Sequence, residues 1–71
     1  MNIVGENVKS IREKKGLTQE QLSAKCNVLE WNISRGTLAK IEVKVRRVTD
    51  IEVKLLALAL KVEIKYLFEN Q

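Results

Sequence analysis

Residues 18–42 read TQEQLSAKCNVLEWNISRGTLAKIE, a stretch whose capping signals and apolar spacing predict two helices joined by a connector. Thr18 and Gln21 form a capping box, in which the threonine hydroxyl accepts from the Gln21 amide and the glutamine side chain reaches back. The first of the two helices is therefore expected over about 19–26. Residues 27–33 show no helical period, so they are expected to form the connector.

A further helix is expected to begin after Ser34, whose hydroxyl can cap the amides that follow. Its apolar residues recur at spacings of three and four, so one face is expected to pack inward. These inward residues are Leu38, Ile41 and Val45. The opposite face is small and basic and carries Arg35, Gly36, Ala39 and Lys40. Such a face differs from an ordinary exposed helix surface, which mixes acidic and basic residues.

Three more helices are expected around this pair. The first covers about 2–15 and ends at Gly16, after two lysines in its last turn. A second capping box, Thr49 with Glu52, begins another helix. Its apolar residues wrap so far around the axis that most of its surface is expected to be covered; they are Ile51, Leu55, Leu56, Leu58, Ala59 and Leu60. A short last helix carries Ile64, Tyr66, Leu67 and Phe68. The fold expected is all-α: one compact five-helix domain over residues 1–71.

The positive charge is concentrated in one segment. Five cations and one anion lie between Arg35 and Arg47, so these residues carry the whole net charge of +4. A basic stripe of this kind can neutralise phosphates and release their counterions. From the charge alone, a solvated surface face explains the stripe equally well.

The composition argues against catalysis and against a metal site. The chain has no histidine, and its one cysteine, Cys26, can form neither an internal disulfide nor a paired-thiolate zinc site. Inert packing is expected for Cys26. We expect no enzyme activity, no cofactor and no small-molecule substrate. The chain has no signal-like start and no long apolar run, so we also expect no membrane contact and a cytoplasmic location.

Three stretches together resemble one known family. They are GENVKSIREKKGLTQEQL at 5–22, SRGTLAKIE at 34–42 and YLF at 66–68, and they resemble the Cro/C1-type helix-turn-helix family, also called the XRE family. The resemblance implies a lambda-repressor-like domain whose helix-turn-helix consists of the helix at 19–26 and the helix after Ser34. It further implies a sequence-specific DNA-binding transcriptional regulator, expected to be a repressor, with the helix after Ser34 in the major groove.

The resemblance also implies roles for individual residues. Arg35, Gly36 and Lys40 match positions that face base edges. Gln19 matches a position that contacts a backbone phosphate, and Ser34 and Thr37 match positions that cap the helix or touch phosphate and thymine methyl groups. The loop residues that grip the DNA backbone are Lys44, Arg46 and Arg47. Arg12 and Glu42 match a buried ion pair that joins the first helix to the one after Ser34.

The chain departs from the family pattern in two places. The connector is about five residues longer, at 28–32, and its Trp31 is expected to cover the core. Where the family commonly ends its recognition helix with Asn-Gly, this chain has Val43 and Lys44. A left-handed lysine costs about 1 kcal/mol or more, so we expect an extended or tightened last turn instead.

Two partner hypotheses follow. A single recognition helix buries too little surface for tight specific binding, so we expect a homodimer on palindromic double-stranded DNA, formed by the last two helices. The alternative is a helical protein-interaction module, such as an antitoxin or an antagonist of another regulator, that binds through Trp31, Tyr66 and Phe68. Tyr66 and Phe68 are otherwise expected to be core and end-cap residues.

Overall fold

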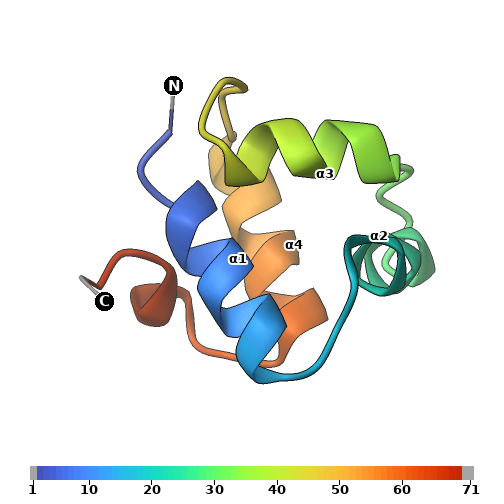
Figure 1. Ribbon diagram of the computed structural model, residues 1–71, viewed down its shortest axis with the longest axis horizontal. Helices are drawn as coiled ribbons and strands as arrows, with labels where there is room; N and C mark the ends of the chain where they lie inside the picture. The colour runs from blue at the N-terminus through green and yellow to red at the C-terminus, as the bar shows by residue number, and fades with distance from the viewer. Residues whose placement is uncertain (1, 70–71) are drawn as a thin grey trace.

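The computed structural model describes residues 2–69, which form four α-helices and one 3₁₀ turn with no strand among them (Figure 1). The elements are α1 (Gly5–Lys14), α2 (Gln19–Val28), α3 (Arg35–Glu42), α4 (Asp50–Leu60) and η1 (Ile64–Leu67). Figure 1 shows α1 and α4 in the middle, α3 across one edge and α2 beside it. The all-α fold is confirmed, but the fifth expected helix is only one short 3₁₀ turn.

The helices begin where side chains satisfy their first amides. Thr18 and Thr49 both form the expected capping boxes, at 3.0 and 3.2 Å from hydroxyl to amide. Ser34 accepts from the Thr37 amide at 3.1 Å, which confirms that it caps α3. The first helix begins later than expected, at Gly5, because Asn2 Oδ1 accepts from the amides of Val4 and Gly5 and so closes a turn before the helix.

All four α-helices end in the same way, with a left-handed residue and two backbone hydrogen bonds that close back on the last turn. This is the Schellman arrangement. The left-handed residues are Gly16, Glu30, Lys44 and Lys61, with φ of 71°, 66°, 68° and 58°. An apolar residue follows each of them, namely Leu17, Trp31, Val45 and Val62. The sequence therefore places a glycine at only one of the four positions that favour it.

This arrangement overturns the expectation for the end of α3. The helix does not run on; it stops at Glu42, and Lys44 takes the left-handed conformation. The two hydrogen bonds, from Lys44 N to Ile41 O at 3.0 Å and from Val45 N to Lys40 O at 3.1 Å, offset its conformational cost. Val45 lies beyond the helix end, and its side chain is exposed rather than inward.

The long connector is explained by the end of α2. This helix runs two residues further than expected, to Val28, and its left-handed residue is Glu30. Trp31 follows and packs half-buried against the core, as expected for a residue that covers it. The added residues are thus used to finish α2 and to bring an indole ring over the core before α3 begins.

The core lies where α1, α2, α3 and α4 meet. Its fully buried side chains include Leu22, Cys26, Leu38, Ile41, Leu56, Leu60 and Leu67. The burial of Leu38 and Ile41 confirms the inward face of α3, and that of Cys26 confirms that the thiol is a packing group.

The expectation that most of the surface of α4 is covered is wrong for one side of this helix. Ile51 and Leu58 are exposed, and the buried residues of this helix lie on the side that faces its neighbours. Tyr66 and Phe68 are also exposed, against the expectation that they are core and end-cap residues. The reason is the shortness of η1: a single turn buries one side chain, Leu67, and cannot cover the outside of α4.

Candidate nucleic-acid interface

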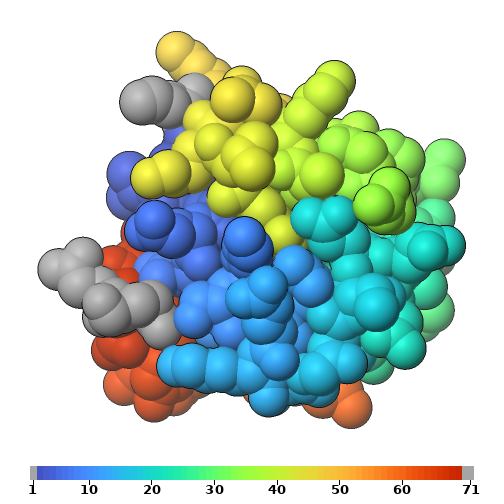
Figure 2. All heavy atoms as spheres, viewed as in Figure 1, coloured from blue at the N-terminus to red at the C-terminus, as the bar shows by residue number. Residues whose placement is uncertain are grey.

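Helix α3 turns its basic face outward. Leu38 and Ile41 are buried on one side, whereas Arg35, Gly36 and Lys40 are exposed on the other. Thr37 and Ala39 lie half-buried between the two sides. In the space-filling view, α3 and the loop after it form the upper edge of the molecule (Figure 2). The helix therefore presents a small, basic surface along an open edge, as a helix that enters a groove must.

Gly36 has no structural reason to be glycine. A Cβ at this position would have only the Ser34 hydroxyl near it, at 3.9 Å, and its backbone is not left-handed. Glycine in a helix costs up to about 1 kcal/mol relative to alanine. Gly36 therefore lowers the stability of α3 at an exposed position where a side chain would fit without a clash. The absence of a side chain leaves the backbone of α3 accessible from outside.

A buried ion pair fixes the end of α3 to α1, as the resemblance implied. Arg12 Nε donates to Glu42 Oε2 at 2.8 Å and Arg12 Nη2 donates to Glu42 Oε1 at 3.1 Å. The remaining guanidinium nitrogen donates to the carbonyl of Leu17 at 2.7 Å. The hydrogen bonds to Glu42 raise the pKa of Arg12 above its ordinary value. One guanidinium group thus ties together α1, the segment before α2 and the end of α3.

Gln19 joins the same network. Its Nε2 donates to Glu42 Oε1 at 3.0 Å, and the side chain is half-buried. The amide group expected to contact a phosphate is thus turned, in the free protein, toward the last residue of α3. It sets the first turn of α2 against α3, which fixes the relation of the two helices.

The loop after α3 contains two exposed cations and one bound cation. Lys44 and Arg47 are exposed. Arg46 instead makes a two-pronged contact with Glu52, with both N–O distances at 2.9 Å, and donates to the Arg47 carbonyl at 2.8 Å. This contact raises the pKa of Arg46 and lowers that of Glu52. Arg46 therefore braces the loop against the start of α4.

The sequence reading missed Asn2 as part of this surface. Asn2 Nδ2 donates to Ile41 O at 3.1 Å and to Arg46 O at 2.7 Å, so it holds both the last turn of α3 and the loop beyond it. A signal was present, because an asparagine just before a helix is a common capping residue. Its contacts 39 and 44 residues away had no signal in the sequence.

Comparison with known proteins gives a match for most of the chain. The Helix-turn-helix family model matches residues 8–67. The chain belongs to this helix-turn-helix family. Its members of the Cro/C1 type, or XRE family, are DNA-binding transcription regulators and are not typically enzymes. Comparisons with curated proteins and with solved structures gave no match.

In this helix-turn-helix protein, α2 and α3 follow one another within the matched residues, and residues 29–34 connect them. None of the helices within residues 2–69 has the length and apolarity needed to cross a bilayer. Over the same residues, acidic, cysteine and histidine side chains do not gather into a group that could hold a metal ion.

Proposed function

We propose that this helix-turn-helix protein is a cytoplasmic, sequence-specific regulator of transcription, acting as a repressor, that places α3 in the major groove of double-stranded DNA. The outward basic face of α3 carries this proposal. Arg35 and Lys40 lie on the exposed side of α3, and each can donate to guanine O6 and N7. Gly36 lies between them, and its missing side chain lets the backbone approach the base edges.

The DNA backbone is contacted from both sides of this face. Lys44 and Arg47 neutralise phosphates beyond the end of α3. Ser34 and Thr37 contact the DNA at the start of α3. Gln19 lies at the N-terminus of α2, where free amides favour an anion. Arg46 was expected to grip a phosphate, but its contact with Glu52 supports a different role, which is to hold the loop that carries Lys44 and Arg47.

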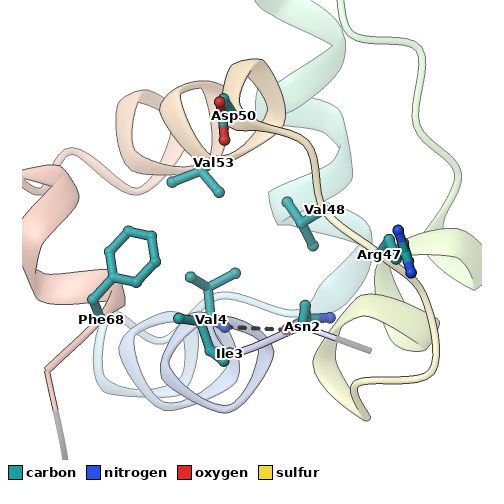
Figure 3. Close-up of a pocket in the computed structure, with 8 residues that line it drawn as sticks. All are labelled: Asn2, Ile3, Val4, Arg47, Val48, Asp50, Val53 and Phe68. Atoms are coloured by element: carbon teal, nitrogen blue, oxygen red, sulfur yellow. Dashed lines mark hydrogen bonds between the residues drawn. The ribbon is translucent and has the colours of Figure 1, made fainter.

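The protein binds DNA as a symmetric dimer formed through α4 and η1. The support is a hollow of about 430 Å³ between the N-terminal segment, the start of α4 and the residue after η1 (Figure 3). Phe68 lies on the opposite side of this hollow from Arg47. Phe68 and Ile3 line this hollow and expose apolar surface that a second copy would cover.

In vitro selection of duplexes from a random pool tests DNA binding. The expected result is one enriched sequence made of two inverted half-sites. Arg35→Ala lowers affinity for that duplex by about 1–3 kcal/mol and relaxes one base preference. Lys54→Ala, which removes the same charge from an exposed site on α4, leaves the preference unchanged. Equal effects of the two variants, or no enrichment at low salt, would contradict the proposal.

Sedimentation with the selected duplex tests the dimer. Two chains per duplex are expected for the natural protein, and Phe68→Ser weakens the assembly. A one-to-one complex at saturation would rule out the dimer.

The alternative, a module that binds another protein through Trp31, Tyr66 and Phe68, is favoured by the exposure of Tyr66 and Phe68 but not by the packing of Trp31 against the core. A stoichiometric protein partner together with no binding to any duplex would replace our proposal with this one.

A further inference from the structure

A second surface of the molecule combines exposed apolar side chains with lysines. Two adjoining hollows of about 230 and 280 Å³ lie between the C-terminal ends of α2 and α4 and share Lys25, Ala59 and Lys61. Val28 and Leu58, 82% and 57% exposed, line the first hollow, and Lys15 lies at the second. We call this surface the lysine-rimmed groove.

The groove is separate from the surfaces described above. On α4, Asp50 and Val53 line the hollow near Phe68, whereas Leu58 and Ala59 line the groove. At 100° per residue these two pairs lie on opposite flanks of the helix. Figure 1 shows the C-terminal end of α4 at the lower edge of the molecule, away from α3 at the upper edge. An occupant of the groove therefore leaves α3 open.

The charge of the groove has one sign. Lys15, Lys25 and Lys61 line it, and no acidic residue does. Over residues 2–69, none of these three ammonium groups takes part in an ion pair. Lys25 and Lys61 also stand at helix C-termini, where their charges are favourable to the fold. The groove thus combines an apolar floor with uncompensated positive charge at its rim.

This combination selects among possible occupants. A nucleic acid gains no favourable contact from the apolar side chains of Val28 and Leu58. The surface that suits a nucleic acid is the outer face of α3, which is small and polar. A second copy in a two-fold contact would bring three lysines against three lysines, which is unfavourable. A lipid surface binds protruding apolar residues, whereas a hollow receives side chains that protrude from a partner.

We propose that the lysine-rimmed groove binds an acidic amphipathic helix of another protein. Its apolar side chains enter the two hollows and contact Leu58, Val28 and Leu29, and its carboxylates lie opposite Lys15, Lys25 and Lys61. The groove thereby gives the molecule a protein contact that is compatible with an occupied α3. This inference does not depend on DNA binding.

The probe is a synthetic helical peptide of about 15 residues with leucines at spacings of three and four and glutamates elsewhere. It is titrated into the ¹⁵N-labelled full chain and followed by amide chemical shifts. Saturable shifts are expected at Val28, Leu58 and Ala59. The same peptide with lysine in place of glutamate is expected to cause none, because like charges face each other.

Variants locate the contact. Leu58→Asn weakens peptide binding about tenfold, the value of one well-buried leucine, and Lys25→Gln weakens it about threefold. Ile51→Asn and Lys54→Gln are matched controls, since both residues are exposed on α4 outside the groove, and they leave binding unchanged. Leu58 is exposed, so its replacement leaves the core intact.

Several results would overturn the proposal. Equal binding of the lysine peptide, equal effects of Leu58→Asn and Ile51→Asn, or shifts confined to α3 would each do so. Shifts at the groove caused by self-association or by phosphatidylglycerol vesicles, with the acidic peptide inactive, would assign it to a second copy or to a membrane instead. Loss of DNA binding alone would leave this proposal standing.

Discussion

Gly5 lies directly against the carbonyl oxygen of Ile41, where a Cβ on the glycine would overlap that oxygen. The same carbonyl accepts a hydrogen bond from Asn2 Nδ2. The first turn of α1 and the last turn of α3 are thus in backbone contact, and the closeness depends on a residue without a side chain. The orientation of α3 on the molecule rests on this contact as well as on the ion pair between Arg12 and Glu42.

Gly5→Ala is expected to destabilise the protein. The added methyl group forces α1 away from the Ile41 carbonyl, an overpacking that costs about 1–3 kcal/mol or more. Urea unfolding measures the loss. Gly36→Ala is the matched control: its methyl group meets open space, and the free energy of unfolding is expected to rise by up to about 1 kcal/mol. The same sign of change in both variants would contradict the contact.

Glu42→Gln is expected to be strongly destabilising. It leaves the buried Arg12 guanidinium without its counter-charge, and breaking a buried pair costs about 3–5 kcal/mol. Glu13→Gln removes the other carboxylate near Arg12, which is 3.9 Å away and exposed, and is expected to cost at most about 1 kcal/mol. Thermal unfolding of the two variants side by side tests the difference, and comparable losses would show that the buried pair has no special role.

Glu30→Gly and Lys44→Gly are each expected to stabilise the protein. Both positions are left-handed, a conformation that costs a residue with a side chain about 1 kcal/mol, and glycine relieves it. Chemical denaturation measures the gain. On the selected duplex, only Lys44→Gly is expected to weaken binding and to reduce the salt dependence by about one phosphate contact. A loss of stability in both variants would contradict this expectation, because it would mean that the side chains of Glu30 and Lys44 stabilise the fold by more than the left-handed backbone costs.

The Cys26 thiol is expected to be unreactive in the folded protein. Burial raises the pKa of Cys26 from 9.0 to about 11, so the thiolate is scarce at neutral pH, and the sulfur is enclosed. Above pH 9 the unfolded chain loses this proton before the folded one does. Stability therefore falls between pH 9 and about 11 and is unaffected by this group below pH 9.

A thiol reagent at pH 8 measures the reactivity. The rate is expected to follow the unfolded fraction as urea is added. In a Cys26→Ala variant, the fall of stability between pH 9 and 11 is expected to be smaller. Rapid labelling without denaturant would contradict the burial.

Much of the local structure could be predicted because its causes are local. A capping residue acts within three or four positions, so Thr18, Ser34 and Thr49 correctly marked three helix starts. The outward turn of Arg35 and Lys40 followed from the spacing of Leu38 and Ile41. Contacts between distant residues had no such signal. Lys44 showed this most clearly, since its conformation depends on a hydrogen-bonded motif that a non-glycine sequence did not indicate.

The sequence by itself determined where α2, α3 and α4 begin, which side of α3 is apolar, and where the positive charge is concentrated. Each of these features depends on residues close together in the chain. The tertiary structure alone decided that Asn2 and Gly5 hold the end of α3, that Arg46 is bound by Glu52, and that Ile51 and Leu58 are left uncovered. These depend on how close the helices approach one another and on how far η1 reaches, and both are fixed only when the whole core packs.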